Sequence, residues 1–135
     1  MTPKVARYLA DMQPATPCLV LDVDRVEANY RRLKAALPQA RVYYAVKANP
    51  AAPILERLTG LGSFFDAASF QEVRMCLDAG AAGARISYGN TIKKERDIAS
   101  AYAAGVRMFA FDSEAELLKL SRAAPGAQVL SLIHI

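Results

Sequence analysis

The chain has 135 residues, 53% of them hydrophobic and 22% charged, and its 17 Lys+Arg against 13 Asp+Glu give a net charge of +4. This length allows one domain, the apolar fraction excludes a disordered chain, and no run reaches the roughly 18–20 apolar residues of a membrane span. The N-terminus lacks the apolar segment of a signal peptide, Cys18 and Cys76 have no metal-ligand spacing, and the basic residues form no patch, so we expect a cytoplasmic protein without metal, membrane or nucleic-acid partners.

The first 37 residues are predicted to form one strand and one helix. Residues 16–22 (Thr-Pro-Cys-Leu-Val-Leu-Asp) have the apolar character of a strand, which lies outside the repeat described next. Asp24 and Glu27 fit a capping box, and apolar residues follow at helical spacing until Pro38. We therefore expect this segment to precede the repeating part of the fold.

Five short β-like runs recur along the rest of the chain, starting at residues 42, 64, 84, 107 and 128. A segment with helical apolar spacing follows each of the first four runs. Capping boxes open two of these helices, at Ser69–Glu72 and at Ser113–Glu116, and a glycine stands near each helix exit. This pattern predicts successive βα units, and therefore a parallel sheet with right-handed crossovers.

Four βα units and a fifth strand fill about half of an eight-stranded barrel. We expect residues 38–129 to be the N-terminal part of a (β/α)8 barrel, although a smaller, open, doubly wound sheet fits the same pattern. Residues 130–135 (Leu-Ser-Leu-Ile-His-Ile) resemble a translated sequencing adapter and are interpreted as a non-native tail, so no function is assigned to His134.

Functional groups of a parallel βα array gather at the carboxyl ends of its strands, and Lys47 ends the first strand. We expect this strand to be buried on both faces and the lysine to enter a partly desolvated mouth. Desolvation disfavours the charged ammonium form, and the free amine is the form that condenses with an aldehyde. The alternative is a lysine that extends from the strand end into solvent.

Other strand ends offer weaker candidates. Asp66 ends the second strand, where it either orients Lys47 or caps the following helix. Tyr88 and Asn90 end the third strand, where they either line a pocket or form a turn. Cys76 is expected on the core face of a helix, and the sequence has no Gly-rich phosphate loop of Walker or Rossmann type.

Four motifs in order resemble those of the fold-type III pyridoxal-phosphate decarboxylases, which act on ornithine, diaminopimelate or arginine. Residues 44–50 (Tyr-Ala-Val-Lys-Ala-Asn-Pro) resemble the cofactor-lysine motif of this group, and residues 61–69, 85–90 and 105–113 resemble its next three strands. The similarity extends from about residue 16 to residue 129. The run Phe-Asp-Ala-Ala-Ser is most similar to the ornithine decarboxylase branch, whereas Tyr88-Gly-Asn90 departs from its usual Ala-Asn-Pro.

The resemblance implies an alanine racemase-like barrel in which Lys47 holds pyridoxal phosphate covalently and Asp66 orients the lysine. Ala67, Tyr88 and Asn90 would form part of the pocket wall. The implied reaction is decarboxylation of a basic amino acid, most simply L-ornithine to putrescine. Diaminopimelate, lysine or arginine decarboxylation, an alanine-racemase-like activity and a non-enzymatic regulator similar to the antizyme inhibitors are the alternatives.

The same resemblance places much of the machinery outside this chain. In the family, the partners of the cofactor ring and phosphate lie later in the barrel, and the N-terminal strand joins a separate β-domain. That β-domain supplies substrate contacts across a homodimer interface. We therefore expect an N-terminal fragment that is inactive by itself and binds the cofactor weakly.

Overall fold

The computed structural model describes residues 1–133 of the chain. Its elements, in chain order, are α1 (Pro3–Met12), α2 (Val23–Ala36), β1 (Tyr43–Ala45), the 3-10 helix η1 (Val46–Ala48), α3 (Ala52–Gly60), β2 (Phe64–Ala67), α4 (Phe70–Asp78), the 3-10 helix η2 (Gly83–Arg85), β3 (Ile86–Tyr88), α5 (Glu95–Ala103), β4 (Met108–Phe111), α6 (Glu114–Ala123) and β5 (Gln128–Ser131). The repeat of βα units predicted from the sequence is confirmed.

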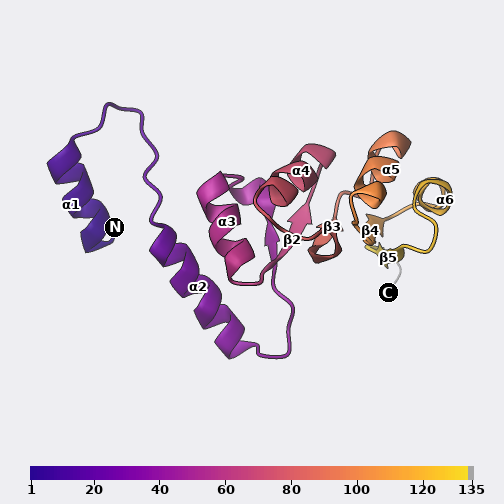
Figure 1. The fold of residues 1–135 in the computed structure, drawn as a ribbon, viewed down its shortest axis with the longest axis horizontal. Helices are drawn as coiled ribbons and strands as arrows, with labels where there is room; N and C mark the ends of the chain where they lie inside the picture. Colours follow the sequence, from indigo (N-terminus) through magenta and orange to yellow (C-terminus); the bar gives the residue numbers. More distant parts are fainter. Residues whose placement is uncertain (134–135) are drawn as a thin grey trace.

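The five strands form one parallel sheet in the order β1-β2-β3-β4-β5. Each strand lies beside its neighbour in sequence, which is the order found in a (β/α) barrel, whereas a doubly wound sheet reverses its order at a switch point. Helices α3 to α6 lie in chain order beside the successive strands (Figure 1). The tertiary structure thus decides between the two folds that the sequence left open.

The two faces of the sheet differ in burial because side chains alternate along each strand. Phe65, Ile86 and Phe109 point toward the helices and are at most 1% exposed. They form one core with apolar residues of α3 to α6. The opposite face carries the polar groups of the candidate site.

Each predicted capping box forms in its serine half only, because the Glu72 carboxylate accepts from the Ala68 N–H and that of Glu116 pairs with Lys93 and Lys119. The backbone N–H of Glu72 donates to Ser69 Oγ (3.2 Å), and that of Glu116 donates to Ser113 Oγ (3.3 Å). The prediction for α2 was wrong by two residues, because its cap is Asp22, whose carboxylate accepts from the Arg25 N–H (3.3 Å). An Asx oxygen directly before the first helical residue is the better-placed acceptor.

The predicted strand over residues 16–22 does not form. A strand needs a neighbouring backbone to satisfy its N–H and C=O groups, and no described strand pairs with this segment. The prediction also missed α1, which begins at Pro3 and is capped by the Thr2 hydroxyl, an acceptor for the Val5 N–H (3.3 Å). Threonine followed by proline is a helix-start signal that the sequence did contain.

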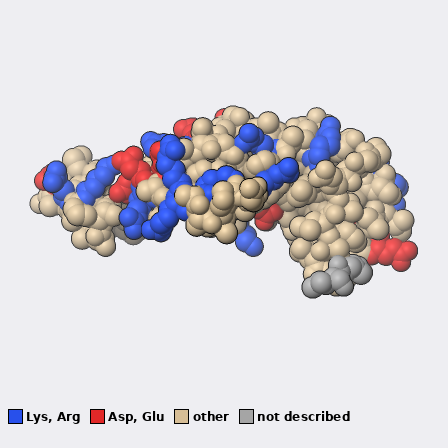
Figure 2. Space-filling view, turned by 90° about the horizontal axis from the view of Figure 1, so that it is seen from below, with Lys and Arg blue, Asp and Glu red and all other residues tan. Residues whose placement is uncertain are grey.

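Helix α2 packs against α3, although its sequence placed it with the N-terminal segment. Arg57 of α3 lies 2.6 Å from a Glu27 carboxylate oxygen of α2 and 3.5 Å from an Asp24 oxygen. Figure 2 shows Lys and Arg gathered over the half of the molecule that holds α1 and α2, with acidic groups among them. Part of this basic charge is therefore paired within the chain.

Strand β5 extends through the boundary predicted between barrel and tail. It pairs with β4 as far as Ser131. His134 and Ile135 lie outside the described residues. The interpretation of these two residues as part of a non-native tail therefore stays a prediction. Within residues 1–133, no helix combines the length and apolar character that a membrane crossing requires.

Candidate functional site

Lys47 lies on η1, directly after β1, at the carboxyl end of the sheet. The loop that follows is held by two hydrogen bonds: the Tyr44 hydroxyl donates to the Asn49 carbonyl (3.0 Å), and Asn49 Oδ1 accepts from the Ala51 N–H (3.1 Å). The lysine therefore projects from a backbone that is fixed on both sides.

The expectation that Lys47 enters a desolvated mouth was wrong for this chain, because the residue is exposed. The residues of β1 are only half-buried, since β1 is an edge strand with one neighbour in the described sheet. The alternative of a solvent-directed lysine therefore describes its surroundings here. The amine still lies close enough to Asp66 for its charge to act on that carboxylate.

Asp66 lies on β2, opposite Ala45 of β1 and opposite Ser87 of β3. Burial raises the pKa of the Asp66 carboxyl. A hydrogen bond from Ser87 and the positive charge of Lys47 oppose this rise, whereas the negative charge of Glu72 adds to it. The carboxylate therefore lies on the strand between the edge strand β1 and the inner strand β3, and the following helix is capped by Ser69 instead.

A hollow of about 380 Å³ covers the sheet face opposite the helices. Its lining comes from all five strands and the residues that follow them: Tyr43, Ala45, Asp66, Ser87, Gly89, Met108, Ala110, Leu130 and Leu132. The polar groups of this lining are Asp66, Ser87 and the hydroxyl of Tyr43. The other residues have apolar side chains or, at Gly89, none. Lys47 does not belong to this lining; it lies on η1, two residues after Ala45.

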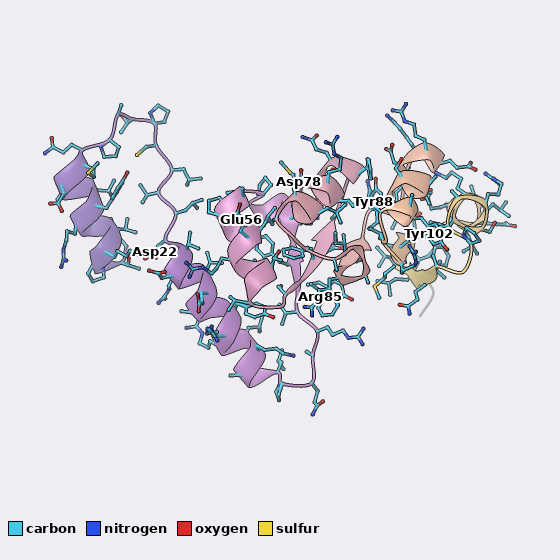
Figure 3. All side chains as sticks on the ribbon, in the orientation of Figure 1. Asp22, Glu56, Asp78, Arg85, Tyr88 and Tyr102 are labelled. Atoms are coloured by element: carbon cyan, nitrogen blue, oxygen red, sulfur yellow. The ribbon has the colours of Figure 1, made fainter. Side chains whose placement is uncertain are left out.

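Three residues predicted as pocket wall do not line this hollow. Ala67 and Tyr88 are buried in the core between sheet and helices, at 0% and 3% exposure, because they alternate with Asp66 and Ser87 along their strands. Figure 3 shows Tyr88 on the helix-bearing side, between α4 and α5. Asn90 is exposed and forms the predicted turn, in which its Oδ1 accepts from the Ile92 N–H (3.4 Å).

Sequence reasoning missed a buried charge network beside the third and fourth strand ends. The side chain of Lys93 is 0% exposed and that of Glu116 is 3% exposed, and Nζ of the lysine lies 2.9 Å from Oε1 of the glutamate. The lysine also donates to the carbonyls of Asn90 (2.8 Å) and Ala110 (2.6 Å). Lys119 lies 2.5 Å from Glu116 Oε2. The network joins the β3–α5 loop, β4 and α6.

Burial lowers the pKa of Lys93, and its interaction with Glu116 only partly offsets this. Burial alone would raise the pKa of Glu116, but the hydrogen bonds and charges of Lys119 and Lys93 outweigh burial and leave that pKa lowered. Glu116 is therefore the ionised centre of the network at neutral pH.

The remaining candidates have structural roles. Burial raises the pKa of the Cys76 thiol to about 12, which fits the predicted core position. Glu72 accepts from the Ala68 N–H (2.6 Å) at the start of α4. No group of three or more His, Cys, Asp or Glu within residues 1–133 has an arrangement that holds a metal ion.

The parallel strands in barrel order define a partial (β/α) barrel. At the carboxyl ends of its strands, a lysine follows the first strand and an aspartate lies on the second. Residues 23–135 match the family described as pyridoxal-dependent decarboxylase, pyridoxal binding domain. The chain belongs to this family, whose cofactor is pyridoxal phosphate.

Three comparisons illustrate the relationship. A lysine/ornithine decarboxylase of Selenomonas ruminantium is 42% identical over 135 residues, which is all of this chain and 34% of that protein. Antizyme inhibitor 2 of Xenopus laevis is 39% identical over 82% of this chain and 24% of that protein. The crystal structure of SrLDC in complex with PLP and cadaverine superposes with a TM-score of 0.88 at 41% identity, covering 100% of this chain and 35% of that one. The chain thus spans about a third of the first relative's length.

Proposed function

We propose that this chain supplies the cofactor-lysine half of a barrel that decarboxylates a basic amino acid. The observation that carries the proposal is the position of Lys47. It lies on η1 at the carboxyl end of β1, two residues after Ala45 of the hollow, and its charge acts on the Asp66 carboxylate, in a chain that belongs to the pyridoxal-dependent decarboxylases.

The residues present fit one end of pyridoxal phosphate. An exposed primary amine is the group that condenses with an aldehyde, and the hollow has the volume of a small-molecule site. Lys47 would hold the cofactor, and Asp66 would orient the amine through its charge. When bound, the cofactor supplies an electron sink for the pair of electrons left as carbon dioxide departs.

Ornithine and lysine are the proposed substrates. The Selenomonas relative, at 42% identity, is named for both amino acids. The sequence favoured ornithine, and this preference stays a proposal together with the homodimer and the cytoplasmic location. A regulator without activity is the second candidate, favoured by the similarity to antizyme inhibitor 2.

The site is tested on the chain itself by incubation with pyridoxal phosphate, borohydride reduction and peptide mapping. We expect preferential labelling of Lys47, which Lys47→Ala abolishes, with weak saturation because much of the family's site lies beyond this chain. Lys94→Ala, which removes another exposed lysine, is the matched control and keeps the labelling at Lys47. Labelling spread evenly over the lysines would contradict the assignment.

The reaction is tested on a full-length protein that carries this chain. We expect release of carbon dioxide from ornithine or lysine, and loss of this release in Lys47→Ala. A full-length protein that labels at Lys47 without releasing carbon dioxide from any basic amino acid would support the regulator instead.

A further inference from the structure

The pairing of β3 with β4 ends two residues before β4 does. The last pair of this register is Tyr88 opposite Phe109, whereas β4 stays paired with β5 to its own end. The residues that follow the last β3–β4 pair, Gly89 and Ala110, both line the hollow. The unpaired strand ends therefore belong to the wall of the candidate site.

The ammonium of Lys93 joins these two strand ends. Its Nζ donates to the carbonyl of Asn90, the residue after Gly89 (2.8 Å), and to the carbonyl of Ala110 on β4 (2.6 Å). A third oxygen atom, Oε1 of Glu116 on α6, lies 2.9 Å from Nζ. An ammonium has three N–H donors, so the three oxygen atoms match its capacity.

Lys93 is fixed along its whole length. Its side chain is 0% exposed, and Nζ lies 5.5 Å from the ring centroid of Tyr88. Its backbone N–H donates to Glu116 Oε2 (3.4 Å), and its carbonyl accepts from Lys119. The charge is therefore held at one point between the β3–α5 loop, β4 and α6.

The two carbonyls depend on this cation. Because both accept from one nitrogen, their oxygen atoms converge, and converging carbonyl dipoles repel each other unless a donor lies between them. A carbonyl that loses its donor in a buried place also loses the free energy of a hydrogen bond. We therefore expect the loop and the end of β4 to separate when the charge is removed.

We propose that Lys93 is a positioning residue, which replaces backbone pairing beyond the last β3–β4 pair and thereby sets the distance between Gly89 and Ala110 in the wall of the hollow. Lys93 is buried and does not itself line the hollow, so it acts through these two residues. The meaning of this device for activity rests on the proposed function, whereas the geometry does not.

Hydrogen exchange of the 135-residue chain, followed by NMR, tests the geometry in Lys93→Met and in the matched control Lys94→Met. The Gly89 N–H, which is bonded to β2 (2.9 Å), reports on the rim, and the Phe64 N–H, which is bonded to the residue before β1 (3.0 Å), reports on the opposite end of the sheet. We expect Lys93→Met to accelerate exchange about tenfold more at Gly89 than at Phe64. Lys94→Met leaves the ratio unchanged. Equal acceleration at both amides would show a general loss of stability and overturn the proposal.

Nitrogen NMR of the Lys93 side chain keeps the proposal testable if Lys93→Met does not fold. In the parent chain, we expect the ammonium hydrogens of Lys93 to exchange slowly with water. We also expect scalar coupling from Nζ, through the hydrogen bonds, to the carbonyl carbons of Asn90 and Ala110. Exchange as fast as that of the exposed Lys94 would overturn the proposal.

Kinetics of a full-length protein that carries this chain test the consequence for the site. We expect Lys93→Met to raise KM for the amino acid about tenfold with a smaller change in kcat, because a displaced wall weakens binding without moving a reacting group. An unchanged KM would contradict a positioning role in the site. A parent protein that releases no carbon dioxide from any basic amino acid would refute the proposed function alone, and the exchange measurements would still decide whether Lys93 positions the rim.

Discussion

Two lysines follow parallel strands of this sheet and have opposite surroundings. Lys47 follows the edge strand β1 and is exposed, whereas Lys93 follows the inner strand β3 and has a fully buried side chain. Lys93 donates to the carbonyls of Asn90 in its own loop and of Ala110 on β4, and it pairs with Glu116 of α6, whereas Lys47 follows an edge strand with one described neighbour. Position within the sheet, rather than the apolar character of the preceding strand, decides whether a strand-end lysine is buried.

The comparison also separates the roles of the two groups. A buried, fully partnered ammonium stabilises the strand ends around it but is not available to a ligand. An exposed amine contributes little to stability and is free to react. Four predictions follow from this difference.

Lys93→Met is expected to cost the most stability, about 3–5 kcal/mol, because it leaves the buried Glu116 carboxylate with one cation and frees two carbonyls. Urea unfolding followed by circular dichroism measures the loss. The neighbouring exposed Lys94 gives the control Lys94→Met, for which the change stays within about 0.5 kcal/mol. Similar losses in both variants would show that the burial of Lys93 has no energetic consequence.

Glu116→Gln is expected to flatten the acid dependence of stability. The pKa of Glu116 is lowered from 4.5, so its stabilising contribution is fully present above pH 4.5 and is lost as the pH falls through the folded-state value. The variant lacks this contribution at every pH, so its difference from the parent shrinks on acidification. Urea titrations at several pH values measure this, and Glu114→Gln, at an exposed position of the same helix, is the control. If the difference in stability between variant and parent grew on acidification, it would contradict a lowered pKa for Glu116.

Asp66→Asn is expected to stabilise the chain slightly at neutral pH, because burial disfavours the charged carboxylate. Burial raises the pKa of Asp66 above 3.8, so its favourable contribution is present below pH 3.8 and is lost as the pH rises through the folded-state value. The gain should therefore disappear below pH 3.8. Thermal unfolding at neutral and acidic pH measures this gain in stability. A variant that is less stable than the parent at neutral pH would contradict the prediction.

Lys47→Met is expected to have the smallest effect on stability, within about 0.5 kcal/mol, because the side chain is exposed. Labelling by pyridoxal phosphate at this position is nevertheless lost. Unfolding and labelling are measured on the same preparation. A large loss of stability would mean that Lys47 has structural partners after all, and the comparison with Lys93 would fail.

Much of the fold was predictable because the signals are local. The spacing of the strands, the caps at Ser69 and Ser113, and the order of the βα units all appear in the structure. The segment at residues 16–22 was not predictable from its apolar character, because a strand forms only where another backbone pairs with it. Helix α1 had a readable signal in Thr2-Pro3 that the strand prediction overlooked.

The site was predictable in part. Position at a strand end singled out Lys47, directly after β1, and Asp66, on the neighbouring strand β2. Ala67 and Tyr88, predicted as pocket wall, are buried on the helix side of the sheet, whereas Asp66, Ser87 and Gly89 line the hollow. The pairing of Lys93 with Glu116 had no local signal, since the two residues are 23 positions apart.

By itself, the sequence determined the family, the repeat of βα units and the positions of a lysine and an aspartate at the first two strands, because spacing and residue type are properties of the chain. Only the tertiary structure decided that the strands follow barrel order, that Lys47 is exposed while Lys93 is buried, and that the Lys93 ammonium lies between the carbonyls of Asn90 and Ala110. These outcomes depend on which backbone lies beside which, and burial and close approach are set by neighbours in space.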